Sequence, residues 1–312
     1  MQKACVLLVA ALLTIRSLEA WDSEGHMMVA YIAFQNLTPA AKTAAMRLLQ
    51  KHPDYQQWVA GIPVDSSHED DRLARAMMMA ATWPDQIKSD SHYRNDGETP
   101  PHTPAAGQNI GYADTFQHRY WHFEDIPFAV SGATGHAPPS INAEERINLF
   151  IAALQQAPTA ALLDKQSYDF VWLLHLVGDI HQPLHCTSRF TPTQSNGDEG
   201  GLKVTVKPTV GASTALHFFW DDLPGVSQDP NAAIAAAGRL PHVSPATSID
   251  VHAWVANSEH LAETVAYAAP IGTSAGPYSL NSAYEQNARQ TASVQLETAG
   301  IRLANIFNAT LR

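Results

Sequence analysis

Cysteine is almost absent from this chain of 312 residues, which contains only Cys5 and Cys186. The first twenty residues are typical of a signal peptide, with an early lysine, a short apolar run and Ala20 before the expected cleavage. Cleavage before Trp21 would remove Cys5 and so exclude an intrachain disulfide. An exported chain of this size is then stabilised by its core, by metal, or by both. We therefore expect a signal peptide over residues 1–20 and a secreted or periplasmic protein.

Long hydrophobic runs are absent as well. The apolar stretch over residues 4–15 is too short to span a bilayer, and no later segment reaches the roughly eighteen residues that a membrane helix needs. Positive charge is also scarce, since 19 Lys and Arg stand against 30 Asp and Glu and give a formal net charge of -11. Such a composition predicts no membrane partner. It favours a nucleic-acid substrate only where bound cations reverse the charge locally.

Most segments show helical periodicity, which predicts an all-α fold class: a single, mainly helical domain over residues 21–312 with a small β-hairpin. Thr38 precedes a proline, as at the start of a helix, and that helix is predicted to run to Leu49. Asn142, with Glu145 three residues later, predicts the start of another helix. These signals are local, so they predict where helices begin without any knowledge of the fold.

Other segments are predicted from their apolar pattern. Residues 168–180 are apolar almost all round, which indicates a buried central helix. Ser282 and Glu285 are interpreted as a capping box for a terminal helix. The alternation over residues 202–206 predicts the hairpin, and the polar residues 89–118 predict a long surface loop.

The most informative segment begins at His175 and ends at His185. His175 and Asp179 lie four residues apart on the predicted buried helix, so both side chains point from one face. Pro183 is expected to end or kink that helix, which would let His185 turn back toward the same site. A buried histidine and aspartate without partners would be costly. We therefore interpret this segment as part of a metal site.

A second pair, His217 and Asp221, has the same spacing. Imidazole and carboxylate are common zinc ligands, and two such pairs can form a site with several ions. Asp85 and Lys88 at the end of a Met-rich helix, and His122 in an aromatic, strand-like context, have a similar composition. Taken singly, each of these groups is more typical of an ion pair, a helix cap or a packed side chain than of a metal site.

The expected N-terminus adds another ligand. Cleavage would leave Trp21 with a free amine, whose reference pKa is about 8, so a metal ion can displace its proton at neutral pH. The amine and the carbonyl of Trp21 can together chelate one ion, and His26 follows five residues later. The alternative is that Trp21 is only the first packed residue of a helix.

In this order and at these spacings, the residues resemble the trinuclear zinc nucleases of fungi, plants and bacteria, the S1/P1 nuclease family. The resemblance runs from Trp21 to the last helix. It implies three Zn²⁺ ions, held by three sets of ligands: Asp85, His122, His175 and Asp179; the Trp21 amine and carbonyl, His26 and the shared Asp179; and His185, His217 and Asp221. His181 is left outside the ligand set as a packed neighbour. The family's Gly-Gly-Asn sequence reads Gly200-Gly201-Leu202 here.

The resemblance also implies a mechanism of phosphodiester hydrolysis. Zinc lowers the pKa of a bound water to about 7, so the nucleophile exists at neutral pH. Asp85 would orient that water, Lys88 would contact the phosphate, and the third ion would stabilise the departing 3′-oxygen, which leaves a 5′-phosphate end. Phe123 would stack on a base and Asp125 would hydrogen-bond it. The implied substrates are single-stranded DNA, single-stranded RNA and 3′-nucleotides.

Two other functions stay open at this point. A zinc-dependent phospholipase C resembles the same fold and metal centre, but the step of five residues from Trp21 to His26, and an aspartate rather than a glutamate at Asp221, favour a nuclease. A non-catalytic exported zinc-binding protein would hold metal without an open coordination position. The same ligands also suit Mn²⁺ or Fe²⁺. We expect a monomer without an obligate protein partner.

Overall fold

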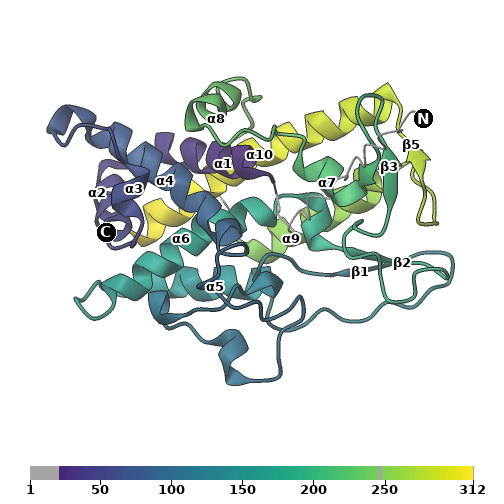
Figure 1. The fold of residues 1–312 in the computed structure, drawn as a ribbon, viewed down its shortest axis with the longest axis horizontal. Helices are drawn as coiled ribbons and strands as arrows, with labels where there is room; N and C mark the ends of the chain where they lie inside the picture. Colours follow the sequence, from purple (N-terminus) through teal and green to yellow (C-terminus); the bar gives the residue numbers. More distant parts are fainter. Residues whose placement is uncertain (1–20, 245–247, 312) are drawn as a thin grey trace, which may run out of the picture.

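The computed structural model describes residues 21–244 and 248–311, so the expected signal peptide lies outside the described residues. The chain is mainly helical with a few short strands, which confirms the predicted fold class (Figure 1). The helices are α1 (Ser23–Gln35), α2 (Pro39–Leu49), α3 (Tyr55–Trp58), α4 (Glu69–Gln86), α5 (Ala143–Leu154), α6 (Leu163–Asp179), α7 (Leu216–Asp221), α8 (Pro230–Ala237), α9 (Val251–Leu261) and α10 (Ser282–Thr310). The strands are β1 (Pro127–Ala129), β2 (Ser188–Phe190), β3 (Thr205–Lys207), β4 (Thr214–Ala215) and β5 (Tyr278–Ser279).

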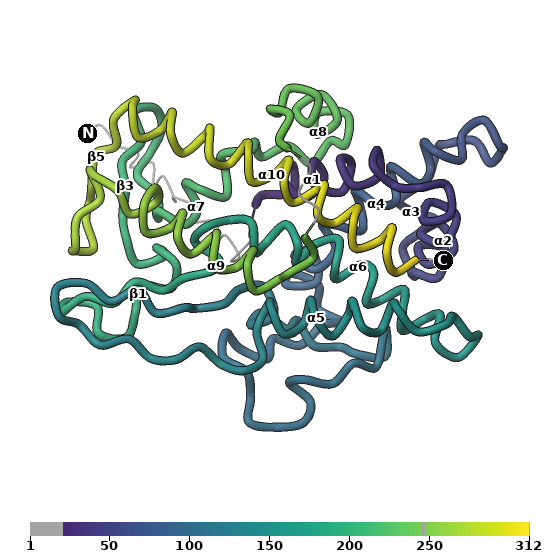
Figure 2. The backbone as a smooth tube through the Cα atoms, turned by 180° about the vertical axis from the view of Figure 1, so that it is seen from behind, coloured from purple at the N-terminus to yellow at the C-terminus, as the bar shows by residue number. Residues whose placement is uncertain are grey.

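Helix α6 is the central helix of the core. It packs against α1, α2, α4, α5 and α10, and every side chain from Gln166 to Asp179 is buried. Figures 1 and 2 show it between α5 on one side and α1 and α10 on the other. The buried helix predicted at 168–180 is therefore confirmed. Because neighbours cover this helix on every side, the polar groups near its C-terminal end are carried into the core.

The predicted starts of two helices are confirmed by their capping bonds. Thr38 Oγ1 accepts a hydrogen bond from Ala41 N at 3.2 Å at the start of α2. Asn142 Oδ1 accepts one from Glu145 N at 3.0 Å at the start of α5. Each bond satisfies an amide that has no partner within the first helical turn.

The capping box predicted for the terminal helix is wrong. Asn281 caps α10, since its Oδ1 accepts a hydrogen bond from Tyr284 N at 2.9 Å, and Ser282 is already helical. Glu285 instead accepts hydrogen bonds from Thr209 N at 2.7 Å and from Thr209 Oγ1 at 2.9 Å. This carboxylate therefore ties α10 to the loop after β3.

The predicted hairpin is confirmed, but it begins later than expected. Strands β3 and β4 pair antiparallel with Val206 opposite Thr214, and β5 adds a parallel partner to β3. Residues 202 and 203 lie in a turn, and residue 204 is irregular rather than part of a strand. Strands β1 and β2 form a parallel pair that was not predicted, because three residues are too few to show alternation.

The predicted surface loop over residues 89–118 is largely irregular, with short 3-10 turns. Its end is not at the surface, since His118 is fully buried and stacks on Trp121. No helix within the described ranges combines the length and the apolar character that a bilayer crossing requires.

Helices α1 and α10 approach closely at Gly300. A Cβ at this position would lie 2.5 Å from Ile32 Cβ and 3.0 Å from Val29 O. Both helices border the centre of the fold, as Figure 2 shows. The missing side chain therefore sets the distance between the helix that carries His26 and the last helix of the chain.

We expect Gly300→Ala to lower the free energy of unfolding by about 1–3 kcal/mol, because the added methyl group overpacks this crossing. The matched control is Gly238→Ala, whose Cβ would meet no atom closer than 3.7 Å. Thermal unfolding of both variants checks this, with a fall of several degrees for Gly300→Ala only. Equal melting temperatures would contradict the close crossing.

Candidate metal centre

The side chains predicted to bind metal form three buried groups. These are His26, His175 and Asp179; Asp85, His122 and His175; and His185, His217 and Asp221. In each group the candidate ligand atoms lie within 4.8 Å of one another. Every side-chain ligand expected from the sequence belongs to one of them, and residues 21–244 and 248–311 contain no further group of this kind.

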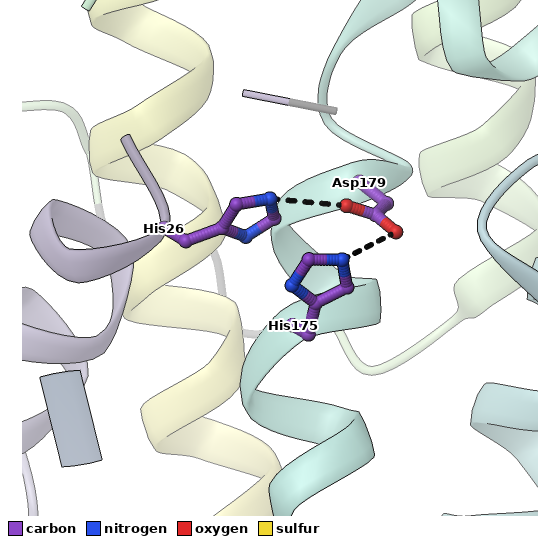
Figure 3. A group of neighbouring side chains, drawn as sticks. All are labelled: His26, His175 and Asp179. Carbon is purple, nitrogen blue, oxygen red and sulfur yellow. Dashed lines mark ion pairs between the residues drawn. The ribbon is translucent and has the colours of Figure 1, made fainter. Parts of the chain in front are cut away.

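Asp179 connects the first two groups. Its Oδ1 lies 3.3 Å from His26 Nε2, and its Oδ2 lies 3.3 Å from His175 Nε2 (Figure 3). The same Oδ2 lies 3.0 Å from His122 Nδ1. The two oxygens of one carboxylate thus face different sets of imidazoles, which is the arrangement of a bridging ligand.

Space for His26 depends on glycine. A Cβ at Gly178 would lie 2.9 Å from His26 Nδ1, and a Cβ at Gly25 would lie 2.6 Å from Trp21 Cβ. Trp21 is fully buried at the start of α1, so its ring packs in the core as the alternative interpretation required. The amide that follows it donates to the carbonyl of Asp221 at 3.1 Å, which ties the start of α1 to α7.

Backbone carbonyls orient three of the imidazoles. His175 Nδ1 lies 2.7 Å from Ala81 O, His185 Nδ1 lies 2.8 Å from His122 O, and His217 Nδ1 lies 2.8 Å from Gly200 O. A neutral imidazole has one N–H, so a ring that donates from Nδ1 presents a lone pair at Nε2. Each of these rings therefore offers Nε2 as its metal ligand.

The Nε2 lone pairs of His185 and His217 face each other, and such an arrangement is suited to binding a cation. His217 Nε2 and His185 Nε2 are 3.1 Å apart, and both rings use Nδ1 for a carbonyl. Two lone pairs at this distance repel each other unless a positive ion lies between the rings, and about 3 Å suits two nitrogens bound to one zinc ion. Both His26 nitrogens are likewise buried without a hydrogen-bond partner. The residues present therefore fit divalent metal.

Burial also shifts the pKa values of these groups, and for the histidines it favours the neutral form that binds metal. Desolvation lowers the pKa values of His26, His122 and His185 well below the ordinary histidine value. Their rings are therefore neutral near pH 7 and available as ligands. Desolvation raises the pKa of Asp179 to about 6. A nearby cation would favour the charged form of this carboxylate.

Asp85 and Lys88 form a buried pair at the end of α4. Lys88 Nζ lies 2.6 Å from Asp85 Oδ1, and only 2% of the lysine side chain is exposed. Asp85 Oδ1 lies 3.6 Å from His175 Nε2, so the same carboxylate faces the second group. Lys88 is therefore part of the centre's surroundings and is not a solvated surface lysine.

Sequence reasoning missed the partner of Asp221. Gln182 is fully buried, and its Nε2 donates to Asp221 Oδ1 at 2.7 Å while its Oε1 accepts from Leu184 N at 2.6 Å. One amide thus fixes both a ligand carboxylate and the turn that carries His185. The position of Gln182 three residues before His185 was the available signal.

Two local predictions about the ligands are wrong. His122 is not in a strand; it follows the 3-10 turn η4 (Arg119–Trp121). Helix α6 ends at Asp179, and Pro183 begins the turn η5 (Pro183–Cys186), because the fixed φ of proline suits the first position of a helical turn. His185 consequently faces His217 and not Asp179, so the expectation that it turns back to the same site fails.

His181 lies outside all three groups, as expected. Its Nδ1 lies 2.6 Å from Val177 O, and its Nε2 lies 2.8 Å from Arg302 Nη1. Both ring nitrogens are therefore used within the protein.

A cleft of about 280 Å³ lies against the centre. Its lining combines metal-site histidines with the side chains expected to bind substrate: His122, His185, His217, Lys88, Phe123 and Asp125. Leu202, at the position of the family's asparagine, also lines it. Burial, together with the carboxylates of Glu199 and Asp198, raises the pKa of Asp125 to about 7. Near neutral pH this carboxyl group can therefore donate as well as accept a hydrogen bond.

Comparison with known proteins gives two findings. The family model described as S1/P1 Nuclease matches residues 21–312. The protein "Endonuclease 4" of Arabidopsis thaliana is 26% identical over 207 residues, which is 65% of this chain and 54% of that protein. The chain thus matches about half the length of this curated relative.

We expect His185→Asn to lower the zinc content of the purified protein by about one ion per chain, because it removes a ligand of the third group. His181→Asn is the matched control, since both nitrogens of His181 have protein partners. Elemental analysis of the dialysed variants checks this. An equal loss of zinc in both variants would make His181 a ligand and overturn its assignment as a packed neighbour.

Proposed function

The chain belongs to the S1/P1 nuclease family, and we propose that it is a zinc-dependent endonuclease. It hydrolyses single-stranded DNA and RNA to products with 5′-phosphate ends, and it also acts on 3′-nucleotides. The observation that carries this proposal is that histidines from two of the three metal-binding groups, His122, His185 and His217, line the same cleft as Phe123. The fold supports a single nuclease domain over residues 21–312.

Three Zn²⁺ ions are proposed, in keeping with a family that depends on zinc. Asp85, His122 and His175 hold the first, His26 and the Trp21 amine and carbonyl the second, and Asp179 is shared by both. His185, His217 and Asp221 hold the third. When bound, zinc supplies a water with a pKa near 7 and offsets the charge of the phosphate. Six positive charges against three aspartates would make the site locally positive in an acidic protein.

The chain's own residues then position the reactants. Asp85 would orient the attacking water while Lys88 holds its carboxylate, and Lys88 would donate to a phosphate oxygen. A lysine ammonium carries three N–H donors, and the bond to Asp85 uses one of them.

Phe123 and Asp125 select for unpaired bases. Phe123 offers a stacking surface, and Asp125 accepts or donates a hydrogen bond at the edge of the base. A duplex would have to unstack and unpair a base to reach Phe123, which costs a few kcal/mol. A single strand avoids most of that cost, so the cleft favours single-stranded substrates.

Two rival functions are less well supported. A zinc phospholipase C would not require a stacking aromatic beside an acid in the cleft. A non-catalytic zinc-binding protein would not require metal ligands that line an accessible cleft, yet His122, His185 and His217 do so. The nuclease proposal accounts for both features.

Export and processing are part of the proposal. The family match begins at Trp21, which is the residue expected after removal of a signal peptide. Secretion or periplasmic export would then free the Trp21 amine for the second ion. We propose a monomer without an obligate partner.

The mature protein beginning at Trp21, loaded with zinc, is expected to cut a single-stranded oligonucleotide and leave 5′-phosphate ends. Chelation should abolish cleavage, and so should one extra residue before Trp21, because it removes the free amine. End-group analysis of the products is the measurement. Intact oligonucleotide in the presence of bound zinc would defeat the nuclease proposal, and hydrolysis of phosphatidylcholine by the same sample would support the phospholipase.

Replacing Phe123 with alanine is expected to raise KM for a single-stranded oligonucleotide about 5- to 150-fold with a smaller change in kcat, because stacking contributes roughly 1–3 kcal/mol per base. Phe123→Tyr should retain the wild-type KM, while Phe123→Leu keeps the bulk but loses the aromatic face. Steady-state kinetics separates these cases. A KM for Phe123→Leu equal to that of the wild type would show that stacking is not the contribution of this residue.

A further inference from the structure

The turn beneath His217 requires glycine at one position. Gly200 has φ of +57°, and a Cβ there would lie 2.3 Å from Leu184 O and 3.2 Å from His217 Nδ1. Its carbonyl is the group that lies 2.8 Å from His217 Nδ1. The orientation of the His217 ring therefore depends on where this turn holds one backbone carbonyl.

A fully buried carboxylate, Asp198, holds the turn. Its Oδ1 accepts hydrogen bonds from Gly201 N at 3.2 Å and from Arg189 N at 2.9 Å. Tyr267 Oη lies 2.9 Å from each of the two carboxylate oxygens. Asp198 thus binds the amide directly after Gly200 and anchors it to two other parts of the chain.

The two anchors are themselves fixed. Arg189 belongs to β2, its Nε lies 3.3 Å from Asp198 Oδ2, and its Nη1 donates to Gly272 O at 2.8 Å. Its guanidinium lies over the ring of Tyr267, 4.3 Å from the centroid. Tyr267 follows the π-helix η6 (Ala262–Ala266), a local irregularity that is frequent at functional sites.

Replacing the Asp198 carboxylate with an amide would remove hydrogen bonds that hold the turn. The groups that hydrogen-bond to the Asp198 carboxylate, Gly201 N, Arg189 N and Tyr267 Oη, all donate to it, and an ionised carboxylate is acceptor-only. An asparagine would direct N–H groups at one or more of these donors and leave a buried donor unsatisfied. Among the residues that the structure describes, Asp198 belongs to none of the three metal-binding groups, and its contact with the Gly200–Gly201 peptide is its link to His217.

We propose that Asp198, anchored by Tyr267 and Arg189, is a positioning residue for the third metal ion: it fixes the Gly200 carbonyl that orients His217. This inference rests on the proposed third ion at His185, His217 and Asp221 but not on nuclease activity. It is therefore tested by metal retention, which can succeed or fail whether or not the protein cuts nucleic acid.

The experiment compares zinc retention in the mature, zinc-loaded protein and its variants under competition with a chelator. His217→Ala identifies the ion of the third group. Asp198→Asn is expected to weaken the binding of that same ion about 10- to 100-fold, the range found when the hydrogen-bonded surroundings of a metal ligand are disturbed. Tyr267→Phe should weaken it less, because one donor is lost while the carboxylate remains.

Asp169→Asn is the matched control, since Asp169 is also fully buried and accepts a hydrogen bond from Asn109 at 2.7 Å. It should retain all zinc as the wild type does. The double variant Asp198→Asn with His217→Ala should lose no more zinc than His217→Ala alone. This result would place the effect of Asp198 on the ion that His217 binds.

Wild-type retention of the third ion in Asp198→Asn overturns the proposal. A parallel loss of every ion also overturns it, because that pattern indicates general destabilisation. Should Asp198→Asn fail to fold, Tyr267→Phe decides by the same criteria: selective weakening of the third ion supports the proposal, and unchanged or uniform release overturns it.

Discussion

A carboxylate buried at the centre of a helical core is the constraint on which this structure depends. Asp179 is fully buried, and an isolated charge is very costly to remove from water unless it is paired or bound to a cation. The fold brings His26 on α1 and His122 after η4 to the helix that carries Asp179. Core packing and the proposed metal binding are therefore coupled, because α1 and α4, which pack against α6, carry the candidate ligands His26 and Asp85.

Backbone carbonyls determine how the histidine rings of the site are oriented. The carbonyls of Ala81, His122 and Gly200 face the Nδ1 atoms of three histidines, and the opposite nitrogens remain for metal. A carbonyl cannot move without its chain, so the orientation of each ring follows from tertiary structure. His122 connects the groups: its ring lies beside Asp179 at the end of α6, and its carbonyl faces His185 in the turn η5.

How far apart two interacting residues lie in the sequence explains which contacts could be predicted. The caps at Thr38 and Asn142 bind amides three residues later. The partners in His175–Asp179 and His217–Asp221 are one helical turn apart, so both members of each pair can be recognised within a short stretch of sequence. Glu285 was misassigned because its donor is Thr209, 76 residues away. The carbonyls that face the histidines could not be predicted for a simpler reason. Every residue has a backbone carbonyl, and only the tertiary structure determines which one lies beside a given ring.

The three groups also differ in what holds them. His26, His175 and Asp179 lie on the long helices α1 and α6, whose packing in the core restrains them. His185 lies in the short turn η5, and His217 is the second residue of α7, a helix of six residues after the hairpin. Short elements have little packing of their own, so polar anchors must replace it, and Gln182 and Asp198 supply them. The third group, built on these anchored turns, also lines the cleft through His185 and His217. The cleft is thus bordered by anchored turns, whereas the buried carboxylate of Asp179 lies at the end of the packed helix α6.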